Sequence, residues 1–271
     1  MDSADTSVRV REAFGRLMDL IATLRSENGC PWDRKQTPES MHHYILEEYH
    51  EMVDALNRGV PGEIADEMGD LIFLVVFVAY LFHQQGVASL TDVLDGVTRK
   101  MERRHPHVFG DVKVSTAEEV VDNWTKVKAA EEIIRNRESI LDGVPRSLPA
   151  LSRAQKLARR AAKVGFDWTR PEEVFVKVDE ELAEFREAIA HGSSGEIREE
   201  LGDLLFVIVN AARHLEVNAE TALDETSDKF ERRFRYIEKG LSDRGTSPMQ
   251  ASLEEMDALW NEAKLQEKDR K

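Results

Sequence analysis

The sequence predicts an all-α fold that contains two tandem copies of one helical bundle. Leu, Ala, Glu, Lys and Arg dominate a chain of 271 residues that holds only 8 prolines, a composition typical of helices. No segment alternates polar and apolar residues as a half-buried strand would. A long pattern of acidic and apolar residues occurs twice, which predicts two repeated units.

The repeated pattern joins two acidic blocks to an apolar run. LEEYHEM, which begins at Leu46, and EIADEMGDLIFLVVFVA recur from Asp179 as DEELAEF and EIREELGDLLFVIVNAA. Four acidic pairs share one offset of 133 residues (181 − 48): Glu48 and Glu181, Glu51 and Glu184, Glu67 and Glu200, and Asp70 and Asp203. We interpret the pattern as an internal duplication.

The similarity continues downstream with other offsets. KMERR, from Lys100, corresponds to KFERR, from Lys229, and the segment that contains Trp124 corresponds to the one that contains Trp260. The changed offsets indicate insertions and deletions in loops, where they are tolerated. The order of the blocks is kept, as a duplication predicts.

The helical spacing of apolar residues gives the expected elements of each half. The first half predicts helices over 8–27, 38–57, 62–85, 89–103 and 117–137. The second half predicts helices over 149–163, 171–190, 195–215, 218–239 and 251–268. We therefore expect an N-terminal helical domain over 1–137, a linker over 138–150 around Gly143 and Pro145, and a C-terminal helical domain over 151–271.

Composition bounds the partners and the compartment. With 52 acidic and 37 basic residues the net charge is −15, which argues against a nucleic-acid-binding surface but allows a small phosphorylated substrate. A single cysteine, Cys30, excludes an internal disulfide and fits a reducing cytoplasm. The N-terminus does not resemble a secretory signal. The longest apolar run, 71–82, is too short to span a membrane and predicts a buried helix. We expect a cytoplasmic protein that binds neither nucleic acid nor membrane.

The second half carries chemistry-bearing side chains on two consecutive helices. Lys177, Glu181 and Glu184 are spaced i, i+4 and i+7, so they share one helix face, and Glu180 lies at its edge. On the next helix Glu200 and Asp203 are one turn apart. Asn210 lies two turns beyond Asp203 on the same stripe.

The apolar residues around Glu200 and Asp203 predict that these acids face the neighbouring helix. Leu201 and the run 204–209 make that helix apolar almost all round, which indicates burial. Buried carboxylates are costly unless they are paired or bind metal, and an oxygen-only ligand set suits Mg²⁺ or Mn²⁺. The alternative is a solvated acidic face favoured by the helix dipole, and a duplication preserves even a pattern without function.

The two acidic blocks resemble the EExxE…ExxD signature of the MazG family. CPWDRKQT from Cys30, RRHPHVFGD from Arg103 and FERRFR from Phe230 are also similar to segments of that family. The resemblance covers nearly the whole chain and includes the two-repeat layout. It implies all-α, usually homodimeric enzymes that use Mg²⁺, with Mn²⁺ as a possible substitute, to hydrolyse canonical and aberrant nucleoside triphosphates to monophosphate and pyrophosphate, as in nucleotide-pool housecleaning or a stress response.

Site roles follow from the resemblance by motif position. It implies that Glu181, Glu184, Glu200 and Asp203 bind the metal, that Lys229 and Arg233 contact phosphates, and that Trp260 lies near the nucleotide. The i, i+4 spacing of Lys229 and Arg233 puts two cations on one helix face, although such residues are often simply exposed. For Trp124 and Trp260, core packing is the commoner role on sequence alone.

The remaining roles in the second half are assigned from position. We expect Lys177 and the two glutamates beside it, Glu180 and Glu181, to take part in catalysis, one glutamate acting as general base. We expect Asn210 to bind substrate.

The two halves differ beside their carboxylates. Tyr44 and Phe77 stand in the first half where the second has Lys177 and Asn210. We therefore predict that the second half holds the principal catalytic site. The first half, with Glu48, Glu51, Glu67 and Asp70, would bind metal weakly, act on other nucleotides or support assembly.

Two other functions remain open from the sequence. A carboxylate-bridged di-iron bundle uses two Glu-x-x-His pairs, and Glu47 with His50 supplies one. The second repeat has Ala183 at the position of His50, so the pair is not repeated there. A non-catalytic helical scaffold, with acids that only keep it soluble, is the other alternative.

Overall fold

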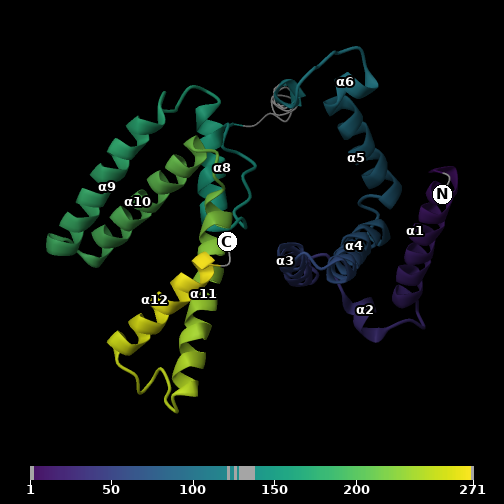
Figure 1. Cartoon of the computed structure of the whole chain (residues 1–271). Helices are drawn as coiled ribbons and strands as arrows, with labels where there is room; N and C mark the ends of the chain where they lie inside the picture. Colours follow the sequence, from purple (N-terminus) through teal and green to yellow (C-terminus); the bar gives the residue numbers. More distant parts are fainter. Residues whose placement is uncertain (1–2, 121–122, 125–126, 128–137, 270–271) are drawn as a thin grey trace. The chain divides into compact units, whose positions relative to one another are not determined.

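The computed structural model describes residues 3–120, 123, 124, 127 and 138–269, and every regular element within them is a helix. The chain divides into two compact units, residues 1–135 (the first unit) and 136–271 (the second unit), which we describe separately (Figure 1). No helix of the described part is long and apolar enough to cross a membrane. The fold is therefore all-α and built on a tandem arrangement, as the sequence predicts.

The first unit is organised around an antiparallel pair of helices. It contains α1 (Ser3–Arg25), α2 (Pro31–Lys35), α3 (His42–Arg58), α4 (Pro61–Gln84), α5 (Leu90–Arg104) and α6 (Pro106–Phe109). The long helix α4 packs against α3 and is also contacted by α1 and α5. The buried core is formed by Ile21, Met41, Leu74, Val76, Phe77 and Leu81.

The described part of the second unit consists of two helix pairs and one further helix, α8 (Ala150–Ala162). The pairs contain α9 (Pro171–His191), α10 (Ser194–His214), α11 (Ala219–Asp243) and α12 (Leu253–Asp269). The α9–α10 pair and the α11–α12 pair run as separate hairpins, and α8 contacts both α10 and α11 (Figure 1). Each hairpin has its own small core: Val174, Val207 and Ala211 in one, and Ile237, Leu241 and Leu259 in the other.

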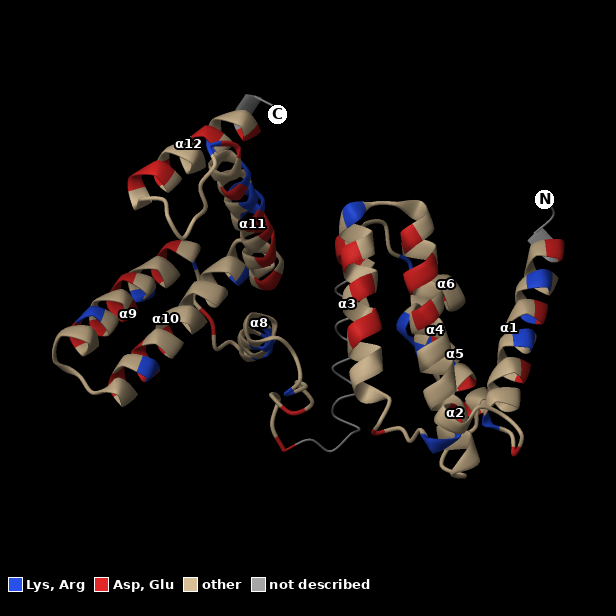
Figure 2. Cartoon of the chain, turned by 90° about the horizontal axis from the view of Figure 1, so that it is seen from below, with Lys and Arg blue, Asp and Glu red and all other residues tan. Residues whose placement is uncertain are grey.

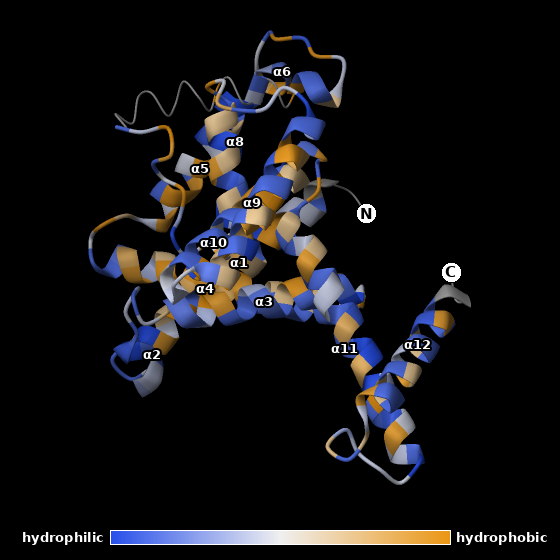
Figure 3. Ribbon diagram, turned by 90° about the vertical axis from the view of Figure 1, so that its left-hand side faces the viewer, coloured by the Kyte–Doolittle hydropathy of each residue, from blue (hydrophilic) through white to orange (hydrophobic). Residues whose placement is uncertain are grey.

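The helices of the second hairpin bury only part of their surface. Hydrophobic and hydrophilic residues are mixed around α11 and α12 (Figure 3). Leu241 and Leu259 are almost fully buried between the helices, whereas Phe230 and Leu265 remain exposed. The α11–α12 core therefore depends on a few side chains.

Most predicted boundaries lie within two residues of the observed ones, but α1 begins at Ser3 and not at residue 8, and α11 ends at Asp243 and not at residue 239. The helix predicted to begin at 38 begins at His42, because Thr37 and Ser40 accept each other's backbone amides through their side-chain oxygens and form a local turn. The short helices α2 and α6 are not predicted; each begins at a proline and is too short to give a periodic signal. Of the helix predicted over 117–137, residues 117–120, 123, 124 and 127 are helical and the rest lies outside the described residues.

Both carboxylate-bearing hairpins turn at a glycine, but for different physical reasons. Gly59 ends α3 with φ of 70°, in the left-handed region where a side chain is strained. Gly192 ends α9 with extended backbone, and a Cβ there would lie 2.7 Å from the carbonyl oxygen of Ala188. Ser193 then starts α10 with a capping box that includes Glu196. These short turns bring two acidic helices side by side in each unit.

The apolar runs on α4 and α10 are less buried than the sequence predicts. In the second unit Val207 and Val209 are buried, but Leu201, Leu205, Phe206 and Ile208 are 41–46% exposed. In the first unit Ile72 and Val75 are 45% and 54% exposed. The expectation that these helices are covered all round is wrong for a single chain, because the helices that contact α4 and α10 leave part of each apolar surface exposed.

Candidate functional site

Three glutamates of the α9–α10 hairpin come together. Glu181 and Glu184 extend from α9 and Glu200 from α10, and one carboxylate oxygen of each lies within 4.8 Å of the other two. Glu181 is buried, Glu200 is half-buried and Glu184 is exposed. We call these residues the second-unit carboxylate group. Its side chains line one edge of a helix interface and are only partly removed from solvent.

Asp203 lies outside this group but close enough to affect it. Burial raises the pKa of Glu200 above its ordinary value, and the negative charges of Glu184, Asp203 and Glu181 raise it further. Of the four acids expected to converge, the structure therefore brings three together and leaves Asp203 as an exposed neighbour.

The donor set is suited to a hard divalent cation. The group offers carboxylate oxygens and no histidine or cysteine. Burial and, after it, repulsion among the acids raise the pKa of Glu200, and a bound cation would offset both effects. The residues present therefore fit a divalent metal ion that prefers oxygen ligands.

Lys177 bridges two glutamates at the edge of this group. Its ammonium lies 2.8 Å from Glu180 and 2.9 Å from Glu181. Hydrogen bonds to Glu180 and Glu181 raise the pKa of Lys177, so it is fully charged at neutral pH. Glu180 is exposed and points its carboxylate to Lys177, whereas Glu181 is shared between Lys177 and the carboxylate group.

Asn210 is buried and is held by residues that the sequence pattern does not indicate. Its Oδ1 accepts a hydrogen bond of 2.7 Å from Nε of Arg213, and Arg213 in turn donates to Asp167. Nε2 of His214 lies 2.9 Å from the same Asp167 oxygen. The i, i+3 spacing of Asn210 and Arg213 was a usable signal, but Asp167 is 46 residues from Arg213, so no local pattern links them.

Lys229, Arg233 and Trp260 lie on the other helix pair. Arg233 donates to Glu267 at 2.9 and 2.6 Å, and its guanidinium stands 5.3 Å from the centre of the Trp260 ring. Lys229 is half-buried one turn before Arg233 on α11. Trp260 packs beside the Ile237 core, as its commoner role suggests. The structure brings these residues together with one another, but on α11 and α12, whereas the carboxylate group is on α9 and α10.

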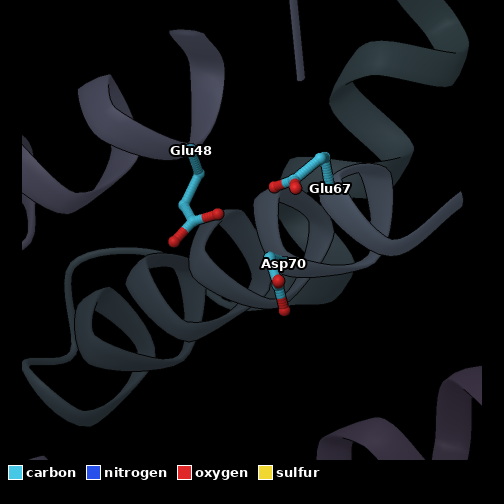
Figure 4. A group of neighbouring side chains, drawn as sticks. All are labelled: Glu48, Glu67 and Asp70. Atoms are coloured by element: carbon cyan, nitrogen blue, oxygen red, sulfur yellow. The ribbon is translucent and has the colours of Figure 1, made fainter. Parts of the chain in front are cut away.

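The first unit contains a related acidic group with a different membership. Oxygens of Glu48, Glu67 and Asp70 lie within 4.8 Å of one another, with Glu48 reaching from α3 toward the two acids of α4 (Figure 4). Glu51 is outside the group, although its charge adds to burial in raising the pKa values of Glu48 and Glu67. We call the three the first-unit carboxylate group.

The surroundings of the two groups differ as the sequence predicts. Tyr44 packs against Trp32 with ring centres 5.4 Å apart, and Phe77 is fully buried in the core, so neither can replace the ammonium or the amide of the second unit. Arg104 stands 5.8 Å from the Trp124 ring, which repeats the Arg233–Trp260 stacking. Acidic residues recur along α3, α4, α9 and α10, and both acidic and basic residues are frequent on α11 (Figure 2).

Comparison with known proteins gives a match in each unit. The family model described as the MazG nucleotide pyrophosphohydrolase domain matches residues 36–109 and 170–237, which contain the two carboxylate groups. A curated protein of Escherichia coli (strain K12), named nucleoside triphosphate pyrophosphohydrolase, is 42% identical over 259 residues, covering 94% of this chain and 98% of its own. A Thermotoga maritima protein, named nucleoside triphosphate pyrophosphohydrolase/pyrophosphatase MazG, is 38% identical over 251 residues, covering 93% and 95%.

Proposed function

Because the chain belongs to the MazG nucleotide pyrophosphohydrolase family, we propose that its second unit uses Mg²⁺ to convert nucleoside triphosphates to monophosphate and pyrophosphate. Hydrolysis of nucleoside triphosphates by a metal-dependent enzyme is the family activity. We also propose that Mg²⁺ is the metal, that the second unit is the catalytic repeat and that the bond between the α and β phosphates is cleaved. The domains would cover residues 1–137 and 151–271, with a linker over 138–150.

The second-unit carboxylate group is the observation that carries the proposal. Glu181, Glu184 and Glu200 would hold the metal directly, with Asp203 as a further ligand from the next turn of α10. Hard oxygen donors favour Mg²⁺, and Mn²⁺ is the natural substitute. Bound Mg²⁺ would supply neutralisation of the triphosphate charge and a more acidic water.

The side chains around the group have complementary tasks. Glu180 or Glu181 would accept the proton of the attacking water, since both carboxylates contact Lys177 and Glu181 belongs to the carboxylate group. Lys177 holds these two glutamates in place and adds a positive charge near the reacting phosphate. Asn210 presents an amide to the substrate from the other end of the hairpin.

Lys229 and Arg233 would bind the phosphates, and Trp260 would lie beside the nucleotide. Arg233 is held by Glu267 and Trp260 in this structure, which gives its guanidinium a fixed direction. These residues lie on α11 and α12, so the proposal requires that α11 and α12 of this or another copy approach the carboxylate group when substrate binds.

A homodimer is part of the proposal. Exposed apolar side chains on α10, among them Leu205, Phe206 and Ile208, give a surface that a second copy could cover. The apolar residues of α4 offer a similar surface in the first unit. Symmetric pairing of like surfaces is the common arrangement in soluble oligomers.

The first unit would have a lesser role. Its carboxylate group has Tyr44 in place of Lys177 and the buried Phe77 in place of Asn210. It would bind metal weakly, act on other nucleotides or support assembly. For the whole enzyme we propose removal of unwanted nucleotides from a cytoplasmic pool.

The alternative di-iron function finds little support. Glu47 and His50 belong to neither metal-competent group among the described residues, and His50 packs against the Tyr49 ring. Iron content and an oxidase assay would test it directly. A non-catalytic scaffold would release no pyrophosphate from any of the eight common nucleotides.

Product identification tests the proposed reaction. The full chain is incubated with ATP and with dCTP in the presence and absence of Mg²⁺, and the products are separated. We expect monophosphate and pyrophosphate, only with the metal. Diphosphate with orthophosphate would reject the proposed bond.

Matched variants test the working repeat. Glu184→Gln should remove most of the activity, and Glu51→Gln, at the corresponding position of the first unit, should remove little. Equal losses would refute the assignment of catalysis to the second unit.

A further inference from the structure

The contacts of Asn210 fix the orientation of its amide. The residue is 5% exposed, and its Oδ1 accepts from Nε of Arg213 at 2.7 Å. Because Oδ1 is the acceptor of this bond, Nδ2 must point the other way. In the described part of the chain Nδ2 has no hydrogen-bond partner, and it is not sealed from solvent. A largely buried amide thus presents two unused donors.

Arg213 is itself held in a fixed position. Its Nη2 donates to Asp167, and the side chains of Arg213 and Asp167 are only 12% and 24% exposed. His214 contacts the same carboxylate at 2.9 Å and is 11% exposed. Asp167 belongs to the loop between α8 and α9, so this cluster ties that loop to the end of α10. The guanidinium therefore has little freedom to release the amide.

The position of Asn210 along α10 indicates what its donors can reach. Ten residues separate it from Glu200, which is about 15 Å along a helix axis, and seven residues, or about 10 Å, separate it from Asp203. A triphosphate bound through metal at Glu200 would not extend its phosphates that far. The sugar and base of the nucleotide are therefore the parts that the donors of Asn210 can reach.

The same end of the hairpin has one partly accessible apolar side chain. Trp168 is half-buried and packs against the small core of Val174, Val207 and Ala211, which are themselves buried. Trp168 directly follows Asp167 in the loop that the cluster holds. A nucleoside needs such a combination of apolar contact and a few fixed polar groups.

We propose that Asp167 and Arg213 are positioning residues that fix the Asn210 carboxamide as a hydrogen-bond donor to the nucleoside part of the substrate. This inference rests on the proposed function of the second unit. It adds two residues outside the EExxE…ExxD pattern and gives Asn210 a specific partner. The first unit has Phe77, Tyr80 and Leu81 at the positions of Asn210, Arg213 and His214, so it lacks this arrangement.

A double-mutant cycle tests the link between Arg213 and Asn210. Pyrophosphate release with Mg²⁺ is measured for Asn210→Ala, Arg213→Met and the double variant of the full chain. Loss of one hydrogen bond predicts a fall in kcat/KM of roughly fivefold to tenfold for each single variant, mainly through KM. The double variant should fall no further, because Arg213 acts through Asn210. Multiplied losses in the double variant, or full kcat/KM in Arg213→Met, would overturn the proposal.

Milder substitutions keep the test independent of folding. Asp167→Asn keeps the shape of the side chain and should raise KM in the same direction. Asn210→Asp removes both amide donors without changing size. Arg170→Gln, which breaks the exposed pair with Glu173 in the same segment, is the control and should leave KM unchanged. A rise in KM for Arg170→Gln equal to that for Asp167→Asn would contradict a specific role.

Inorganic tripolyphosphate separates the nucleoside from the phosphates. It carries the phosphate chain alone, so its inhibition constant should be the same for wild type and Asn210→Ala while KM for ATP rises. An equal rise in both constants would assign the amide to phosphate and overturn the inference. Failure of the proposed function is a different result, namely wild-type protein that releases no pyrophosphate with Mg²⁺.

Discussion

Lys177 forms an ion pair with Glu181 at 2.9 Å, while Glu181 also belongs to the second-unit carboxylate group. The ammonium therefore lies beside the most buried acid of the group and shields part of its charge. A metal ion that binds Glu181 must share this carboxylate with Lys177. In the first unit Tyr44 occupies the corresponding position, so Glu48 has no such partner from one turn before it on its own helix.

Removal of this cation should separate metal binding from catalysis. We predict that Lys177→Met binds Mn²⁺ a few-fold more tightly than wild type, because a positive charge beside a ligand opposes the ion. Its kcat/KM should fall by about tenfold or more, since a charged hydrogen bond to a glutamate of the site is lost. Mn²⁺ titration followed by electron paramagnetic resonance, together with steady-state kinetics, measures both effects. Tyr44→Phe is the matched control, and weaker Mn²⁺ binding by Lys177→Met would contradict this account.

The carboxylate group should lower stability when metal is absent. Because burial and neighbouring acids raise the pKa of Glu200, its ionised form at neutral pH is less favourable in the folded than in the unfolded chain. We predict that Glu200→Gln melts at a higher temperature than wild type in EDTA and shows a smaller rise in Tm on addition of Mg²⁺. Glu187→Gln, an exposed change on α9, should behave as wild type. A lower Tm for Glu200→Gln in EDTA would argue against repulsion at this site.

Asp167 should stabilise the protein in a pH-dependent way. Burial raises the pKa of Asp167, but hydrogen bonds from Arg213 and His214 outweigh it and hold the pKa below its ordinary value. A carboxyl whose pKa is lowered by folding contributes stability above its unfolded pKa, and the contribution is lost as the pH falls through the folded value. Urea unfolding of wild type and Asp167→Asn should therefore differ most near pH 7 and converge below about pH 4. A difference that does not change with pH would contradict the ion pair as its source.

The α11–α12 hairpin should depend on Leu259. This side chain is 2% exposed between Ile237 and Leu241, and a Cβ on Gly240 would lie 2.7 Å from one of its methyl carbons. We predict that Leu259→Ala lowers the free energy of unfolding by about 2–5 kcal/mol. Leu253→Ala, at a position 74% exposed, should change it by less than about 0.5 kcal/mol. Similar losses in the two variants would show that Leu259 is not the core residue of this pair.

The carboxylate groups could be predicted because they depend on local geometry. The i, i+3 spacing of Glu181 and Glu184 places both on one side of α9, and the short turn at Gly192 brings α10 alongside. The offset of 133 residues extends the same reasoning to Glu48 and Glu67. Which acids join each group could not be predicted, since Asp70 is a member in the first unit while its counterpart Asp203 is not in the second. Side-chain rotamers decide this, and spacing alone does not specify them.

Contacts between segments far apart in the chain could not be predicted from the sequence. The contact of Arg213 with Asp167 joins α10 to a loop 46 residues earlier, and nothing in either segment specifies the other. The apolar stretch from Leu201 onward predicts burial, yet its outer side chains are exposed in one chain. A hydrophobic pattern indicates that a helix face is buried by a neighbour, but it does not indicate whether the neighbour is the same chain or another molecule.

The most direct test of the metal assignment is a crystal structure of the full chain with Mn²⁺, with data collected at the manganese absorption edge. We predict an anomalous difference peak among the carboxylates of Glu181, Glu184 and Glu200, lost in Glu200→Gln. A peak elsewhere in the second unit, or none among these three residues at saturating Mn²⁺, would contradict the account.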